Sequence, residues 1–180
     1  MRNRIGGRNM NETLTNIMSR RSIRSYTNES VCESSMRLVL AAGCAAPSSM
    51  GVRPVRFIVL NKNRMAALAE KISQKAPFQQ AQWAIAVCAD TRDYKHGLGW
   101  IEDCAAAMEN MQIAAKSLGL GSLWFGVYAR KSKESAIREF LEVPDGVEVL
   151  GITVIGYAKD IPEGYTGVDE SRVRYGNWSD

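Results

Sequence analysis

The residues best suited to chemistry form a short basic segment near the N-terminal end of the chain. Arg20, Arg21 and Arg24 bring three guanidinium groups close together, and Ser22 lies between them. A guanidinium presents a planar fork of N–H donors that matches phosphate oxygens, and a serine hydroxyl adds a short neutral donor. The segment therefore predicts a site for an anionic group, with a solvated basic turn as the alternative interpretation.

A short helix precedes this segment and must hold it in place. Leu14, Ile17 and Met18 recur at helical spacing, which gives the helix one apolar stripe. Residues 30–33 have the spacing of a capping box and predict a second helix that runs toward Ala42. A loop of proline and small residues follows that helix.

Apolar stretches of strand length alternate with helical patterns in the rest of the chain. The predicted strands are 55–60, 83–89, 122–127 and 148–155, one helix is predicted over 101–118, and apolar positions at helical spacing within 65–72 and 136–141 mark two more helices. Residues 83–89 are almost wholly apolar, which indicates a central strand. Helix 101–118 is apolar around most of its girth, which indicates burial inside the domain or against another subunit. Taken alone, the alternation predicts a parallel, doubly wound sheet.

Composition limits the classes of protein that the chain can form. Of its 180 residues 46% are apolar and 23% charged, as in an ordinary globular domain. The net charge of +4 is small for a nucleic-acid binder without a recognisable module, and no apolar run approaches the ~20 residues of a membrane span. We expect residues 1–10 to be a flexible tail and residues 11–180 a single domain, with neither nucleic acid nor membrane as a partner. The polar chain beyond residue 159 either frays or lies across something.

Several kinds of site lack their sequence patterns. The chain has no glycine-rich dinucleotide turn, phosphate loop, nucleophile elbow or His/Cys metal spacing, so we expect no metal site. The single histidine, His96, is predicted to be solvated. Cys32, Cys44, Cys88 and Cys104 each lie in an apolar context, so we expect buried, reduced thiols and a cytoplasmic protein.

Four segments, in order along the chain, resemble the flavin-dependent nitroreductase family, especially its short members. They are residues 20–24, residues 46–59, residues 118–126 with the preceding helix around 103–106, and residues 169–175. Together they span nearly all of the chain beyond Met10. The resemblance is therefore to a whole domain, since no single motif carries it.

The resemblance implies that the chain binds flavin mononucleotide (FMN) through four sets of residues. The ligands of the phosphate and ribityl chain are Arg20, Arg21, Ser22 and Arg24. The segment that reaches the same flavin from a second subunit contains Pro47, Ser48, Ser49 and Gly51. The strand edge beside the flavin ring is Leu123, Trp124, Phe125 and Gly126, and the basic pair by which the tail returns to the phosphate is Arg172 and Arg174. Without the resemblance, each set has an ordinary structural interpretation. The serines could belong to a plain turn, the strand residues to the core, and the tail arginines to a solvated segment.

Three positions depart from the family pattern. Gly51 stands where asparagine is frequent and can serve only through its backbone, and Val55 stands where tryptophan is usual. Arg53 replaces a glutamine before Pro54. We expect Arg53 to lie near the flavin ring or the substrate entrance and to favour NADPH over NADH, with an exposed loop arginine as the alternative.

The resemblance also implies a fold and an activity. The fold class is α+β: a three-layer α/β/α sandwich with a mixed, mainly antiparallel sheet, assembled as an intertwined homodimer with two flavins at its interface. The activity is transfer of hydride from NADH or NADPH, through FMN, to an electron-poor acceptor such as a nitroaromatic, a quinone or an enone. No acid or base is indispensable to this scheme, so no catalytic side chain is named. The alternatives are a flavin-binding protein without turnover, and a family member that acts as a dehalogenase or dehydrogenase.

Overall fold

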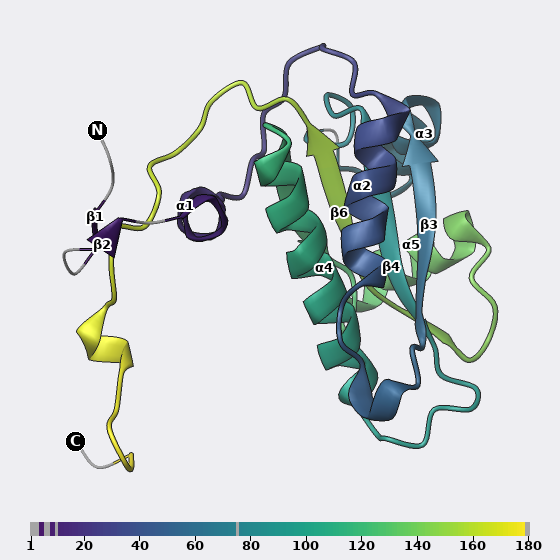
Figure 1. Cartoon of the computed structure of the whole chain (residues 1–180). Helices are drawn as coiled ribbons and strands as arrows, with labels where there is room; N and C mark the ends of the chain where they lie inside the picture. Colours follow the sequence, from purple (N-terminus) through teal and green to yellow (C-terminus); the bar gives the residue numbers. More distant parts are fainter. Residues whose placement is uncertain (1–3, 6–7, 10, 75, 179–180) are drawn as a thin grey trace.

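The structure is a computed structural model that describes residues 4–5, 8–9, 11–74 and 76–178. It has three layers, with a central sheet between two pairs of helices (Figure 1). The sheet contains, in order across it, β3 (Val55–Asn61), β4 (Trp83–Asp90), β6 (Val147–Gly156) and β5 (Gly121–Gly126). Every neighbouring pair of these strands is antiparallel.

This order shows that the parallel sheet predicted from alternation alone is wrong, and it confirms the α+β fold that the resemblance implies. Asn61, the last residue of β3, pairs with Trp83, the first residue of β4. The chain between them therefore returns to the end of the sheet from which it left, whereas a crossover would start a parallel strand at the other end. Helical and strand periods in the sequence do not show in which direction a strand runs. A single parallel bridge, between Ser22 and Ser122, makes the pairing mixed.

Two helical layers cover the two faces of the sheet. One layer contains α2 (Glu33–Cys44) and α4 (Gly99–Ser117), and the other contains α3 (Lys62–Lys71) and α5 (Lys131–Leu141). Along β4, Ala84, Ala86 and Cys88 belong to the core under α3 and α5, whereas Ile85 and Val87 belong to the core under α2 and α4. Successive side chains of a strand point to opposite faces, so a strand buried on both faces reads as continuously apolar.

Close packing of α2 on α4 depends on a glycine. A Cβ atom on Gly43 would lie 2.9 Å from the side chain of Met111, so any other residue there would require that side chain to shift. The C-terminal end of α4 (residue 117) has the glycine cap that the sequence predicts. Gly119 has a φ angle of +76°, and the N–H of Leu120 donates to the carbonyl of Ala115 at 2.8 Å.

The start of α2 differs from the prediction. Cys32 precedes the first helical residue and makes no side-chain capping bond, so the capping box that begins at Ser30 is not formed. Val31 is buried, and its carbonyl accepts a hydrogen bond from the indole of Trp83 at 3.1 Å. This tertiary contact fixes an extended backbone before Glu33, and nothing in the local sequence signals it.

The expectation that all four cysteines are buried is wrong for two of them. Cys88 and Cys104 are buried, and burial raises the pKa of each thiol to about 12. Cys32 and Cys44 lie at the two ends of α2 and are exposed. Hydrogen bonding of Cys32 with the hydroxyls of nearby serines lowers the pKa of its thiol to about 7. All four cysteines are free.

The N-terminal end of the chain lies outside the three layers (Figure 1). β1 (Arg4–Ile5) and β2 (Arg8–Asn9) form a short antiparallel pair, and the rest of the predicted tail over 1–10 lies outside the described residues. The domain boundary at residue 11 stays a prediction. Helix α1 (Glu12–Ser19) follows, as its apolar spacing predicts. Its side chains Leu14 and Ile17 are exposed, so the chain does not cover this apolar stripe itself.

The C-terminal segment also leaves the domain. It runs from β6 toward α1, where the N–H of Tyr165 donates to the carbonyl of Met18 at 2.9 Å, and then extends past α1 (Figure 1). A short 3₁₀ turn, η2 (Glu170–Arg172), is its one helical turn among the described residues. The prediction that this segment frays or lies across something is met by its contact with α1. In the part of the chain that the structure describes, no helix is long and apolar enough to cross a bilayer.

Candidate functional site

The basic segment is fixed beside strand β5. Ser22 bridges to Ser122, and the N–H of Ile23 donates to the carbonyl of Ser122 at 2.9 Å. Ile23 is buried, and the hydroxyl of Tyr26 lies 2.8 Å from the Ile23 carbonyl. Gly121 permits the close approach, because a Cβ there would lie 2.8 Å from Ile23. The apolar residue between the arginines therefore anchors the segment, and the basic side chains are presented from a fixed backbone.

Arg20 is the most enclosed of the three arginines. Its Nη1 donates to Oε1 of the buried Gln112 at 3.2 Å, and its Nε lies 3.2 Å from a carboxylate oxygen of Glu109. The Gln112 amide nitrogen is buried without a hydrogen-bond partner, and the Arg20 Nε–H has the Glu109 ion pair but no well-directed hydrogen bond. Unsatisfied buried donors are costly, and the oxygens of an anionic group are the partners that they require. The donor set therefore fits a phosphate, and Gln112 joins the site although nothing in the sequence pattern pointed to it.

Arg21 and Arg24 lie on the exposed side of the segment. The Arg21 guanidinium stacks on the ring of Tyr165 at 3.9 Å and donates to the carbonyl of Glu163. Arg24 is exposed, with one long contact of 3.4 Å to the Ser22 carbonyl. The hollow that Arg20 and Arg21 line holds only about 20 Å³. That volume admits about one water molecule, so a mononucleotide needs further space than this conformation of a single chain offers.

The second predicted set, Pro47, Ser48, Ser49 and Gly51, lies in the loop between α2 and β3. A short 3₁₀ turn, η1 (Ser49–Gly51), shapes it. The backbone N–H of Ser49 donates to Oδ1 of Asp103 at 2.7 Å, and the Ser48 hydroxyl accepts from the N–H of Arg53 at 2.9 Å. Met50, Gly51 and Arg53 all have positive φ angles, of 50°, 70° and 53°. The loop is thus held in an uncommon backbone conformation by two side-chain acceptors.

Asp103 is the residue in this loop region that sequence reasoning missed. It lies in the second turn of α4 and is only 4% exposed. Besides Ser49, its carboxylate accepts from the hydroxyl of Tyr94 at 3.3 Å, and partial burial together with this carboxylate raises the pKa of Tyr94. Its neighbour Glu102 is exposed, and the sequence pattern of α4 does not distinguish the two carboxylates.

Strand β5 divides its predicted contacts between two faces. Leu123 and Phe125 pack with the core under α3 and α5, where Phe125 meets Phe78 edge-on at 5.1 Å. Trp124 is half-buried on the opposite face, with the core under α2 and α4. Side chains of this strand therefore cannot all meet one ligand. Gly126 lies beside the Arg130 side chain at the end of the strand.

The structure does not bring the tail arginines to the basic segment within one chain. Arg172 lies in η2, and the Arg174 guanidinium donates to the carbonyls of Ser171 and Val173 at 3.0 and 2.9 Å. This part of the tail lies beyond α1, away from the sheet (Figure 1). Among the described residues, no group of three or more His, Cys, Asp or Glu side chains could hold a metal ion.

The two main groups of site residues lie at different levels of α4. Arg20 contacts Gln112 near the C-terminal end of this helix, whereas Ser49 contacts Asp103 near its N-terminal end. At 1.5 Å of rise per residue, these contact points are separated by about 14 Å along the helix. Each set of residues is held by its own hydrogen bonds, and within a single chain the two sets do not meet.

Comparison with known proteins places this arrangement in a family. The model of the Nitroreductase family matches residues 17–101 and 79–157. An Archaeoglobus fulgidus protein, provisionally named NADH dehydrogenase/NAD(P)H nitroreductase, is 38% identical over 165 residues, which cover 89% of this chain and 93% of that protein. An FMN reductase [NAD(P)H] of Bacillus subtilis is 31% identical, over 84% of this chain and 68% of its own.

A solved structure supports the same grouping. The FMN-dependent nitroreductase of Clostridium difficile R20291 superposes with a TM-score of 0.83 at 31% identity, covering 92% of this chain and 99% of that one. The chain belongs to the nitroreductase family. The resemblance seen in the sequence is thereby confirmed.

Proposed function

We propose that the protein is an FMN-dependent oxidoreductase that takes hydride from NADPH or NADH and reduces an electron-poor small molecule such as a nitroaromatic or a quinone. The observation that carries this proposal is the basic segment anchored along β5, with the buried amide nitrogen of Gln112 beside Arg20 lacking an acceptor. Relatives named as FMN reductases and as an FMN-dependent nitroreductase support it. The flavin, when bound, supplies the hydride chemistry.

The chain's own residues would hold the cofactor at two ends. Arg20, Ser22 and Arg24 would bind the phosphate, because guanidinium donors match its oxygens. The loop with Ser48 and Ser49 would approach the ring through its small residues, which let the backbone come close to an aromatic ring. Arg172 and Arg174 would close the phosphate end from the tail, and β5 would border the ring.

We further propose a homodimer. The 14 Å separation along α4, the small hollow beside Arg20 and the extended tail all leave the site incomplete in one chain. Exposed apolar residues lie on the elements that leave the domain: Leu14, Ile17, Ile161, Tyr165, Val168, Tyr175 and Trp178. A second copy would cover these residues and bring its 47–51 loop to the ring of the flavin whose phosphate the first copy holds. The exposed free thiols Cys32 and Cys44 support a reducing, cytoplasmic environment.

Anaerobic titration tests the activity. The purified yellow protein should bleach near 450 nm with NADPH or NADH and recover its colour on addition of a nitroaromatic. A yellow protein that neither nucleotide bleaches would favour the alternative of a flavin-binding protein without turnover. Arg20→Ala and Arg24→Ala should each weaken FMN binding by ~1.5–3 kcal/mol, the scale of a charged hydrogen bond, and Ser22→Ala by less. Arg37→Ala, at an exposed ion pair on α2, should change nothing.

Sedimentation tests the assembly. We expect a dimer that carries one FMN per chain. A monomer with stoichiometric FMN would contradict both the dimer and the role given to Ser48 and Ser49. An Arg20→Ala/Arg24→Ala double variant that keeps all of its flavin on dialysis would contradict the phosphate assignment alone.

A further inference from the structure

A second cleft lies beside the 47–51 loop, and Ser48 is among the residues that line it. It holds about 250 Å³ between the C-terminal end of α2 and the start of β3. Its walls include the apolar side chains of Pro47, Val55 and Phe57 and the basic side chains of Arg53 and Arg56. Pockets that enclose a whole small molecule are usually larger, at about 300–1,000 Å³. The cleft therefore suits one end of a longer ligand.

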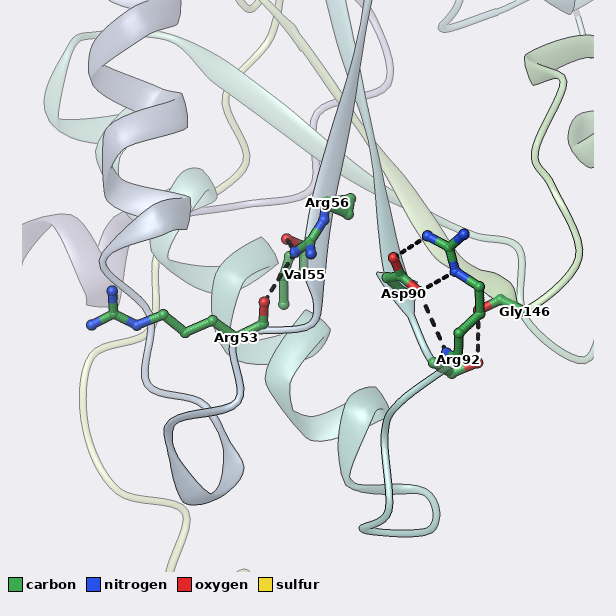
Figure 2. Close-up of polar contacts among 7 residues, drawn as sticks. Arg53, Val55, Arg56, Asp90, Arg92 and Gly146 are labelled. Atoms are coloured by element: carbon green, nitrogen blue, oxygen red, sulfur yellow. Dashed lines mark hydrogen bonds and ion pairs between the residues drawn. The ribbon is translucent and has the colours of Figure 1, made fainter.

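The charge of this cleft is positive. None of the described residues that line it is acidic. Arg92, and to a smaller extent Arg56, lower the pKa of the nearby Asp90 carboxylate to about 2, and the ion pair that Asp90 forms with Arg92 carries no net charge (Figure 2). The end of α2 contributes a partial negative charge of about half a unit, which two guanidiniums outweigh.

The guanidinium groups of Arg53 and Arg56 differ in their hydrogen bonding. Arg56 donates through Nη1 to the carbonyls of Arg53 and Val55, each at 3.0 Å, which holds its guanidinium against the loop. The Arg53 side chain extends away from Arg56 (Figure 2). Within the described part of the chain, the Arg53 guanidinium has no hydrogen-bond or ion-pair partner. One guanidinium is thus fixed at the cleft and the other is available to a ligand.

Arg53 also occupies an unfavourable backbone position. Its φ angle is +53°, which costs a residue with a Cβ about 1–2 kcal/mol relative to the right-handed region. Glycine or asparagine would adopt this conformation more easily. Backbone strain of this kind is frequent at ligand-binding sites. A strained arginine beside a cleft, with its guanidinium unpaired, is therefore a candidate for ligand binding.

We propose that Arg53 and Arg56 form a subsite for the 2′-phosphate of NADPH and thereby give the enzyme a preference for NADPH over NADH. The inference rests on the proposed function, since it names the reductant of that same enzyme. A phosphate monoester carries close to two negative charges at neutral pH and matches two guanidiniums. The apolar wall of Val55 and Phe57 suits the adenosine to which that phosphate is attached.

Nucleotide binding tests the subsite without requiring turnover. Calorimetry on the purified protein compares adenosine 2′,5′-bisphosphate with adenosine 5′-monophosphate. We expect the bisphosphate to bind about tenfold more tightly or better, which is the scale of a charged hydrogen bond. Arg53→Gln/Arg56→Gln should abolish the difference, and Arg37→Gln, which removes an exposed positive charge on α2, should keep it. Equal affinities in the unaltered protein, or a difference that survives the double variant, would overturn the proposal.

Steady-state kinetics assigns the phosphate to the reductant. The double variant should lower kcat/KM for NADPH about tenfold or more and leave that for NADH unchanged. Arg53→Lys and Arg56→Lys should retain part of the preference, because the charge remains while the fork is lost. If bisphosphate binds but the NADPH/NADH ratio does not respond, the cleft serves a different phosphate and the NADPH assignment is wrong. If neither nucleotide reduces the flavin while bisphosphate still binds, the proposed function fails and the phosphate subsite stands.

Discussion

The carboxylate of Asp103 accepts a hydrogen bond from the backbone N–H of Ser49 at 2.7 Å. This contact joins the buried second turn of α4 to a loop whose residues have positive φ angles. Without the Asp103 carboxylate, the loop amide would lack its acceptor and the Tyr94 hydroxyl would lose one of its hydrogen bonds. The loop that we assign to the flavin ring therefore takes its shape from a helix that the flavin itself need not touch.

Replacing Asp103 should consequently affect both stability and cofactor binding. Asp103→Ala leaves the Ser49 amide unsatisfied, so we expect the free energy of unfolding to fall by ~1–3 kcal/mol and FMN to dissociate faster. Asp103→Asn keeps an acceptor for the amide and should lose less of both. Urea denaturation and the return of flavin fluorescence on dilution measure the two effects. Glu102→Gln, an exposed neighbour on the same helix, is the control, and an Asp103→Ala protein that matches it would show that the contact does not shape the loop.

Glu109 should compete with the phosphate for Arg20. Its carboxylate lies 3.2 Å from the Arg20 Nε, and its side chain is 44% exposed. Glu109→Gln removes this competitor, so FMN should bind about two- to fivefold more tightly, the scale of an exposed ion pair. The gain should shrink as salt is raised, because salt screens exposed charges. Glu139→Gln breaks a comparable exposed pair with Lys71 on the far layer and should leave FMN affinity unchanged. Weaker binding in Glu109→Gln would mean that the glutamate orients Arg20 for the ligand.

Cys32 should be the reactive thiol of the protein. Ser34 and Ser35 lower its pKa to about 7, and its place before the first turn of α2 acts in the same direction. In a Cys44→Ser background, alkylation by iodoacetamide should rise with pH through a midpoint near 7, since the thiolate is the nucleophile. Ser34→Ala/Ser35→Ala should move the midpoint up toward the usual ~8.5. A midpoint that the serines do not change would contradict this account of the thiol.

The sequence is sufficient to locate most elements because their patterns are local. Strands β3 to β6 and helices α3 to α5 appear within a few residues of their predicted bounds, since each has its own apolar period or glycine cap. The direction of the strands was not predictable in this way. The direction depends on which end of the sheet residues 62–82 return to. Asn61 pairs with Trp83, and this pairing between strands is a tertiary contact that no local pattern contains. The start of α2 was mispredicted for a similar reason, because Trp83 reaches back to Val31.

The candidate site was predictable where it depends on residue type. Three arginines with Ser22 between them announce an anion site at the level of the sequence. Their supporting residues were not predictable, because Gln112 and Asp103 come from a helix whose apolar pattern hides them. The position of Arg172 and Arg174 beyond α1, away from the basic segment, was equally unpredictable. It depends on the course of a tail that has no helical or strand period.

Relief of the strain at Arg53 should separate stability from nucleotide preference. Asparagine adopts left-handed backbone angles more readily than arginine, so Arg53→Asn should raise the free energy of unfolding by ~0.5–1 kcal/mol. It should at the same time lower the NADPH/NADH preference, because the cation is gone. Glu142 is the matched control, since its φ angle is +54° at the end of α5, away from the cleft. Glu142→Asn should stabilise the protein to a similar extent without changing the nucleotide preference, and Arg56→Asn should lower the preference without stabilising. Chemical denaturation and paired NADPH and NADH kinetics distinguish the three variants. An Arg53→Asn protein that is less stable and keeps its preference would show that Arg53 supports the loop and does not bind the phosphate.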